Sequence, residues 1–240
     1  LDRLQDLFVD REQLGNLTLT IDSNVQEAAA EALQGRAGAV VALDPRTGGI
    51  LAMYSNPTYD PNQLSTLDTA AANRANEVLN AADGNPKLSR VYQDRFSPGS
   101  TFKVVTAAAG IEHGGVGRDA PAYPVRSTYE APGRGAPLPN FGGGSCGGTL
   151  FEILQDSCNT AFARMGAEDV GPDGMLDTAQ SFGFNDSVPF DLPPSEGGGE
   201  VESVFPDIPE NSLPLLAQAS IGQHDVQATP LQMALVAAAV

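Results

Sequence analysis

Ser100 and Lys103 stand three positions apart, after a Pro98-Gly99 turn and at the start of an apolar stretch that predicts a helix. Residues at i and i+3 share one face of a helix, so the Lys103 amine can lie against the Ser100 hydroxyl. A lysine in apolar surroundings has either a partner or a lowered pKa, and both conditions suit a base that activates a serine. The spacing therefore predicts nucleophilic catalysis through Ser100.

The same spacing also has a simpler explanation, a serine that caps the helix and a surface lysine that extends its amine into solvent. Lysine is rare in this chain, which contains only Lys87 and Lys103. An uninterrupted apolar helix argues against an exposed amine at Lys103. From this stretch alone, both interpretations remain open.

A second polar pair, Ser157 and Asn159, interrupts a helical region further along the chain. Residues two apart do not share a face of a continuous helix, but both can point into one cleft where the chain turns between two helices. The alternative is a helix interruption in which these side chains bond only to the local backbone. Taken alone, the pair does not decide between the two.

The elements that must position these residues follow from periodicity and turn signals. In chain order we expect a strand at 17–21, a helix at 22–35, a β-hairpin at 37–54, a helix at 66–82, the Ser100 helix ending near 114–115, helices from 149 to 165 around Ser157, a helix at 172–182, a helix or strand at 215–221 and a last helix from Thr229. Capping boxes are expected at Ser23/Gln26 and at Thr149/Glu152.

Three of the segments without a predicted helix or strand have a distinctive composition. Residues 114–148 are dense in Gly and Pro, and a connection this long in a compact domain is usually functional or mobile. Residues 185–213 are acidic and irregular, with an exposed loop at 197–200. Residues 1–16 are expected to be the tail of a preceding non-catalytic module or a linker, which leaves 17–240 as one domain.

Composition limits the possible functions. Hydrophobic residues make up 41% and charged residues 18% of the 240 residues, as in a globular protein, and no apolar run approaches bilayer length. The formal charge of −17 argues against nucleic acid or anionic lipid as partners. His113 and His224 stand far apart, so we expect no metal and no cofactor. Cys146 and Cys158 are compatible with one disulfide or with two thiols.

The order of the two motifs resembles the penicillin-binding proteins. Ser-Thr-Phe-Lys at 100–103 and Ser-Cys-Asn at 157–159 match the Ser-x-x-Lys and Ser-x-Asn motifs that this family shares with class A β-lactamases. The segments 38–53 and 218–234 also resemble the family, as its opening hairpin and the segment before its third motif. The resemblance covers about 17–240 and is closest to the monofunctional (class B) transpeptidases of cell division and elongation.

The third motif of that family, Lys-Thr-Gly, does not occur in this sequence. Its absence indicates either an incomplete domain or an inactive relative. The predicted last helix is still apolar at Val240, so we expect the sequence to stop before the motif. It also lacks an initiator Met, so we expect it to begin inside a longer protein, with any membrane anchor upstream.

The resemblance implies an acyl-transfer cycle on peptidoglycan stem peptides. Ser100 would attack the penultimate D-Ala carbonyl, and Lys103 would take the serine proton. Ser157 would relay that proton to the leaving amine, while Asn159 would hold the substrate amide. A second stem peptide then completes the cross-link, and a β-lactam antibiotic enters the same first step and remains attached to Ser100.

The resemblance also implies an architecture and a location. We expect a mixed α/β (α+β) fold, with an antiparallel sheet flanked by helices and a helical lobe that carries Ser157. The family acts on the outer face of the plasma membrane, held by an anchor and associated with cell-wall synthesis or divisome proteins. In such an exported domain a disulfide between Cys146 and Cys158 is favoured, and it would tether the Gly-rich loop beside Ser157.

Two other functions share the fold. A β-lactam hydrolase or sensor also carries Ser-x-x-Lys, but class D β-lactamases resemble Ser-x-Val where this chain has Asn159. A non-catalytic scaffold of a cell-wall complex would account for the missing third motif. A hydrolase turns over a chromogenic cephalosporin, a transpeptidase is acylated and stalls, and a scaffold forms no adduct.

Overall fold

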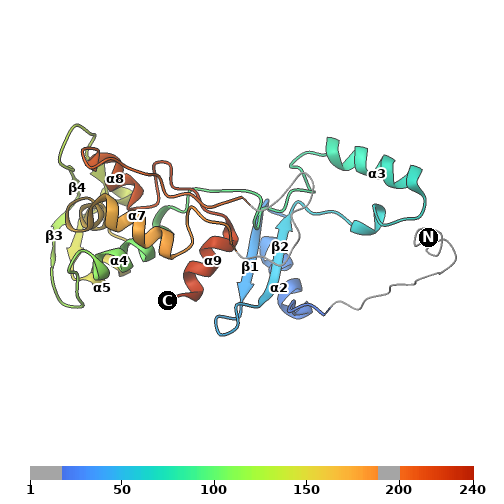
Figure 1. Cartoon of the computed structure of the whole chain (residues 1–240), viewed down its shortest axis with the longest axis horizontal. Helices are drawn as coiled ribbons and strands as arrows, with labels where there is room; N and C mark the ends of the chain where they lie inside the picture. The colour runs from blue at the N-terminus through green and yellow to red at the C-terminus, as the bar shows by residue number, and fades with distance from the viewer. Residues whose placement is uncertain (1–17, 189–200) are drawn as a thin grey trace, which may run out of the picture.

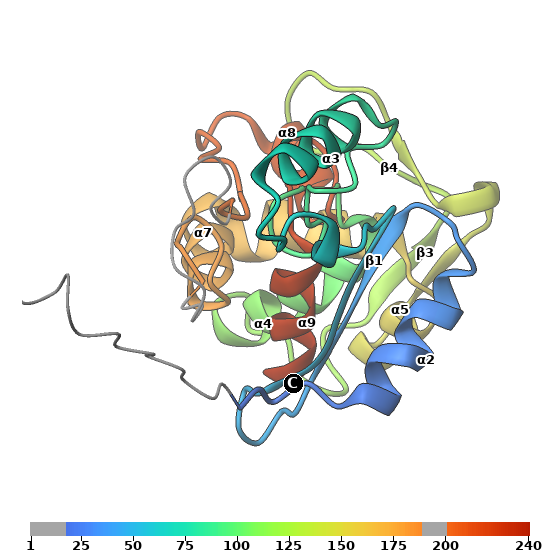
Figure 2. The same ribbon diagram turned by 90° about the vertical axis from the view of Figure 1, so that its right-hand side faces the viewer.

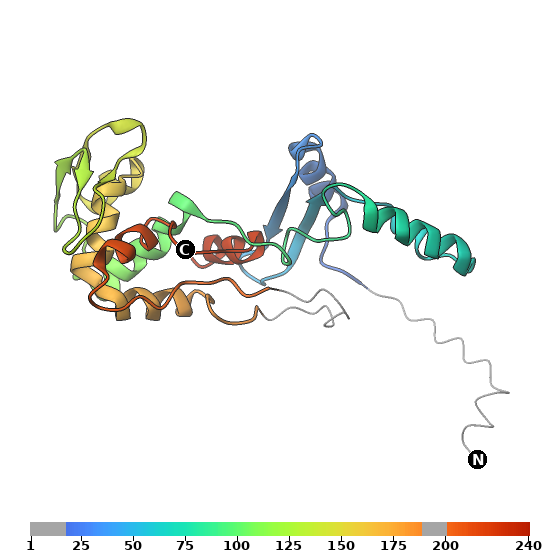
Figure 3. The same cartoon turned by 90° about the horizontal axis from the view of Figure 1, so that it is seen from above.

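The computed structural model describes residues 18–188 and 201–240, so the predicted tail at 1–16 and loop at 197–200 lie outside the described residues. The described chain is elongated, with a helical lobe at one end, a β-hairpin in the middle and helix α3 (Thr69–Ala81) at the other end (Figure 1). Seen from above, α3 projects away from the rest of the protein (Figure 3). The architecture is a mixture of helices and antiparallel strands, as predicted. Within the described residues, no helix is both long and apolar enough to cross a bilayer.

The hairpin is formed by β1 (Gly38–Leu43) and β2 (Ile50–Asn56), which pair antiparallel with Val41 opposite Met53. It lies between α2 (Ser23–Leu33) on one side and α9 (Pro230–Ala238) on the other (Figure 2). Helix α9 begins as predicted, because the Thr229 side chain accepts a hydrogen bond from the Gln232 backbone N–H. The predicted hairpin and last helix are therefore confirmed.

Two predictions near the start of α2 are wrong. The Asp22 side chain caps the helix by accepting from the N–H groups of Asn24 and Val25, so Ser23 and Gln26 do not form a capping box. The Gln26 carboxamide instead bonds to both backbone groups of Met53, at 2.9 and 2.7 Å. Residues 18–21, expected as a strand, do not form one, and the Thr20 hydroxyl donates to the Ile50 carbonyl of the hairpin at 2.7 Å. The first error arises because the hairpin offers the Gln26 side chain a partner that is distant in sequence.

The helical lobe is built around α4 (Lys103–Glu112), whose side chains are largely buried. The π-helical segment η4 (Met165–Val170) and α7 (Gly171–Ser181) pack against α4, and α8 (Leu213–Ala219) packs on η4 and α7. The segment expected as a helix or strand at 215–221 is thus helical. Apart from bridge pairs such as Val204 with Gln227, the described residues 201–212 are irregular, as predicted.

The Gly- and Pro-rich region expected to lack structure contains four short strands. They are β3 (Tyr123–Arg126), β4 (Thr128–Tyr129), β5 (Leu138–Pro139) and β6 (Cys146–Gly148). β3 pairs with β6 and β4 pairs with β5, both antiparallel. Strands this short contain too few residues for alternation to be visible, so only their pairing partners identify them.

Candidate active site

Ser100 lies on a 3-10 turn, η2 (Gly99–Phe102), that leads directly into α4. Side chains at i and i+3 are eclipsed in a 3-10 turn, which suits the Ser100–Lys103 contact better than an α-helical turn does. The Lys103 amine donates to the Ser100 hydroxyl at 3.1 Å. The predicted pairing of serine and lysine is therefore present.

The Lys103 amine also contacts both polar residues of the second motif, Ser157 and Asn159. It donates to the Ser157 carbonyl at 2.6 Å, to the Ser157 hydroxyl at 3.0 Å and to Asn159 Oδ1 at 2.6 Å. Lys103 is 1% exposed, so the alternative of a solvent-exposed lysine is wrong. The structure thus brings four sequence-predicted residues of the two motifs to one point.

The surroundings of Lys103 lower the proton affinity of its amine. Burial lowers the pKa of its amine from 10.5 to about 8, because desolvation penalises the charged form. Its four hydrogen-bond partners are uncharged oxygens, and the Phe162 ring lies 5.8 Å from Nζ. A neutral amine is therefore accessible near physiological pH, as a base for Ser100 requires.

Two contacts hold the Ser100 turn in place. Phe102 is fully buried, stacked on Phe205 at 5.6 Å between ring centroids and edge-on to Phe184 at 5.3 Å. The Gly99 N–H donates to the Gly222 carbonyl at 2.9 Å, which joins the turn to the segment after α8. The aromatic cluster and this backbone bond together position the Ser100 hydroxyl above the start of α4.

Ser157 lies at the junction between α5 (Leu150–Gln155) and α6 (Asn159–Arg164), where the chain turns. Its φ of 52° places it in the left-handed region, which is uncommon for a non-glycine residue. The predicted turn at Ser-x-Asn is therefore confirmed, and it lets Ser157 and Asn159 face the same amine. The Thr149/Glu152 capping box at the start of α5 is also present.

The two cysteines form a disulfide, the pairing that the family resemblance favoured. Their Cα atoms are 5.8 Å apart, within the usual range for a bridged pair. The bond connects β6 at the end of the Gly-rich region to the residue between Ser157 and Asn159. Cys158 is fully buried and Cys146 lies at the cavity wall.

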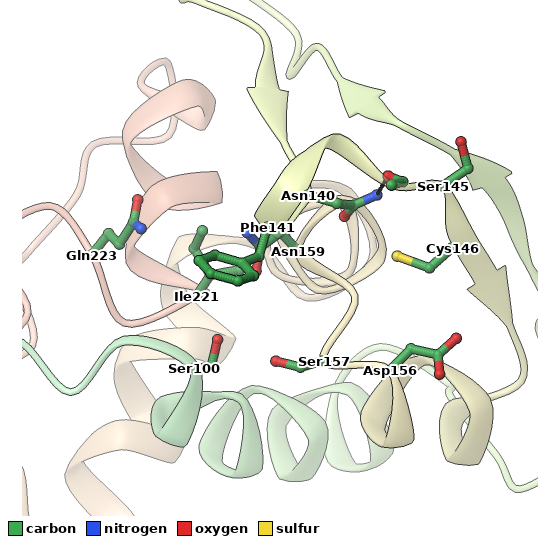
Figure 4. Close-up of a pocket in the computed structure, with 11 residues that line it drawn as sticks. Ser100, Asn140, Phe141, Ser145, Cys146, Asp156, Ser157, Asn159, Ile221 and Gln223 are labelled. Atoms are coloured by element: carbon green, nitrogen blue, oxygen red, sulfur yellow. Dashed lines mark hydrogen bonds between the residues drawn. The ribbon is translucent and has the colours of Figure 1, made fainter.

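Ser100, Ser157 and Asn159 line a cavity of about 520 Å³. Figure 4 shows the two serine hydroxyls on its floor, with Phe141 and Gln223 above them. Besides these three residues and Cys146, seven residues without a role predicted from the motifs line the cavity: Asn140, Phe141, Gly144, Ser145, Asp156, Ile221 and Gln223. The sequence signal for four of them was their setting, since Asn140 and Phe141 precede Gly142-Gly143-Gly144 and Ile221 and Gln223 lie within 218–223. In the described part of the chain, no cluster of His, Cys, Asp and Glu could hold a metal ion.

Residues 38–240 match the family model described as the penicillin binding protein transpeptidase domain. The chain belongs to this family. It is 40% identical to the peptidoglycan D,D-transpeptidase PbpA of Mycolicibacterium smegmatis and 37% identical to PbpA of Mycobacterium tuberculosis. Each match covers 99% of this chain and 48% of the relative, so the chain spans about half the length of these curated relatives.

Solved structures of transpeptidase-domain proteins have the same fold. Penicillin-binding protein A of M. tuberculosis, in its penicillin G acyl-enzyme complex, matches with a TM-score of 0.83 and 36% identity over 99% of this chain and 55% of that chain. Pseudomonas aeruginosa PBP2 matches with a TM-score of 0.79 and 31% identity over 92% of this chain and 48% of that chain. The predicted family and fold class are confirmed.

Proposed function

We propose that this chain carries the nucleophile and the base of a class B peptidoglycan D,D-transpeptidase. The observation that supports this most directly is the buried Lys103 amine, which contacts the hydroxyls of both Ser100 and Ser157. A base with a lowered pKa between two hydroxyls can take a proton from one and return it through the other. The relatives named D,D-transpeptidases support the same reaction class.

Acylation begins when Ser100 Oγ attacks the carbonyl carbon of the penultimate D-Ala of a stem peptide, while neutral Lys103 takes the hydroxyl proton. The backbone N–H of Ser100, at the start of the helical turn, stabilises the developing oxyanion. The C–N bond to the terminal D-Ala then breaks, and the proton returns through Ser157 to the leaving amine. The product is an ester on Ser100 and free D-Ala.

Asn159 is proposed to orient the substrate. Its Oδ1 accepts from Lys103, and its Nδ2 donates one hydrogen bond to the Pro139 carbonyl at 3.1 Å. A carboxamide nitrogen carries two N–H groups, so the second can donate to a substrate amide in the cavity. The amine of a second stem peptide then attacks the ester, forms the cross-link and releases Ser100.

β-Lactams enter the first step of this cycle. The lactam C–N bond opens instead of a peptide bond, and the amine that leaves the carbonyl stays tethered to the acyl group. It can block the approach of the attacking amine, so the ester persists. Relatives of this chain have been solved as imipenem and penicillin G acyl-enzymes.

The setting of the reaction is also proposed from the family. Residues 17–240 form part of an extracytoplasmic transpeptidase domain, held at the plasma membrane by an anchor, and 1–16 belong to a preceding module. The charge of −17 suits an acidic, well-solvated surface. Other cell-wall synthesis or divisome proteins are the expected partners.

The proposed function is tested by intact mass spectrometry of the protein, expressed from its complete gene, after exposure to benzylpenicillin. We expect one stable adduct of benzylpenicillin mass, mapping to Ser100, and none in Ser100→Ala. Turnover of a chromogenic cephalosporin without a lasting adduct would indicate a hydrolase. A folded protein that forms no adduct would indicate a scaffold.

The rate of acylation is expected to increase as the pH rises through about 8 and then to level off. Lys103 can accept the serine proton only when its amine is neutral, and burial lowers the pKa of that amine to about 8. Below this value the neutral fraction falls about tenfold per pH unit. Stopped-flow acylation measured from about pH 6 to pH 10 tests this. A midpoint near the ordinary lysine pKa of 10.5 would contradict it.

A further inference from the structure

The Asn140 side chain joins three segments of the lobe, although neither motif includes it. Its Nδ2 donates to the Arg126 carbonyl at 2.8 Å and to the Gly144 carbonyl at 2.9 Å. Its Oδ1 accepts from the Thr160 backbone N–H at 3.0 Å. Asn140 is 7% exposed, so these bonds form where water cannot easily replace them.

The bond to Thr160 supplies a cap that α6 does not have locally. The first N–H groups of a helix have no partner within the helix, and Ser, Thr, Asp or Asn at the N-cap usually provides one. Here the N-cap residue is Cys158, which makes no capping hydrogen bond and is used in the disulfide. Asn140, twenty residues earlier in the chain, therefore caps α6 from outside the helix.

This cap lies next to the catalytic contacts. Asn159 is the first residue of α6, and its Oδ1 is 2.6 Å from the Lys103 amine. The nitrogen of the Asn159 carboxamide is held as well, because Nδ2 donates to the carbonyl of Pro139, the residue before Asn140. Residues 139 and 140 thus hold both the backbone and the side chain at the start of α6.

We propose that Asn140 is a positioning residue for acylation, acting as a remote cap that keeps Asn159 and Ser157 on the Lys103 amine. Ser157 is in a left-handed conformation that local preferences disfavour, so its position depends on what holds the chain on either side. On one side α5 closes by its own backbone bonds. On the other side the Asn140 cap and the disulfide hold the chain.

The test compares Asn140→Ala with Asn56→Ala in the full-length protein. Asn56 is a matched control because its Nδ2 also donates to two backbone carbonyls, those of Gly35 and Arg36, both at 2.9 Å. The cavity lining does not include it. Both variants lose a carboxamide that bonds to backbone carbonyls, so both are expected to lose stability.

We expect Asn140→Ala to lower the first-order acylation constant for benzylpenicillin roughly 10- to 100-fold, because misplacing catalytic groups by about 1 Å costs this much. The dissociation constant of the noncovalent complex should change much less. Asn56→Ala should acylate within about twofold of the unmodified protein despite its lower unfolding temperature. Equal losses in both variants, or an unchanged acylation constant in Asn140→Ala, would overturn the proposal.

A second variant separates capping from loop anchoring. Asn140→Asp keeps an oxygen for the Thr160 N–H but loses the bonds to the Arg126 and Gly144 carbonyls. We expect it to acylate faster than Asn140→Ala, and it serves as the test if the alanine variant does not fold. If Asn140→Asp lowers the acylation constant as much as Asn140→Ala does, the capping role is refuted. If only the aspartate variant folds, a decrease of its acylation constant of more than about 100-fold would refute it. This inference rests on the proposed function. If the unmodified protein is not acylated, the proposed function fails; if it is acylated but Asn140→Ala is acylated equally fast, only the positioning role of Asn140 fails.

Discussion

Lys103→Met is expected to lower the acylation rate of Ser100 by benzylpenicillin about 10²- to 10⁴-fold, the usual contribution of a general base. Methionine is similar in length and suits the apolar side of the pocket, which includes Phe162. The oxygens of Ser157 and Asn159 lose a donor, so a decrease in stability of about 1–3 kcal/mol is expected as well. The loss of rate exceeds what this destabilisation can explain.

Lys87→Met is the matched control, because Lys87 is the only other lysine in the chain. Its amine donates to Asn76 Oδ1, and it does not line the cavity. Stopped-flow acylation together with urea unfolding separates rate from stability in both variants. Acylation of Lys103→Met within about tenfold of the unmodified protein would show that another group removes the serine proton.

Gly222→Ala is expected to destabilise the lobe and to displace the Ser100 turn. A Cβ at Gly222 would lie 2.1 Å from the Gly99 carbonyl oxygen and 2.8 Å from its carbonyl carbon and nitrogen. These are backbone atoms, so no side-chain rotation can relieve the overlap. The φ of +70° adds strain for any residue with a Cβ. Strain and overpacking together predict a loss of roughly 2–5 kcal/mol in the free energy of unfolding.

Gly115→Ala separates these two causes. Gly115 has a similar φ of +64°, but a Cβ there would meet no atom within 4 Å. It should therefore cost only the conformational strain, about 1–2 kcal/mol, and leave acylation unchanged. Urea unfolding and the acylation rate measured on both variants test this. If the two alanines cost the same, or if Gly222→Ala acylates normally, the close approach of Gly222 to Gly99 does not position Ser100.

Local sequence predicted correctly those features whose partners lie within a few residues. The Ser100–Lys103 contact depends on i,i+3 spacing, which brings the two side chains together in a 3-10 turn as in an α-helix. The Thr149/Glu152 capping box and the Thr229 cap were predicted for the same reason. Where a distant partner competed, as Met53 does for Gln26, the local prediction was wrong.

The hairpin could therefore be predicted from the residues alone, whereas the serine–lysine contact and the turn at Ser157 were each one of two interpretations that the residues left open. That the Lys103 amine contacts Ser157 and Asn159, 54 and 56 positions away, is decided by the packing of the lobe. The same holds for Asn140 as the cap of α6, and for the short strands paired across the Gly-rich region. The physical reason is that spacing and capping act over one or two turns. Contacts between distant segments form only when those segments are buried together, and their hydrogen bonds gain strength from that burial.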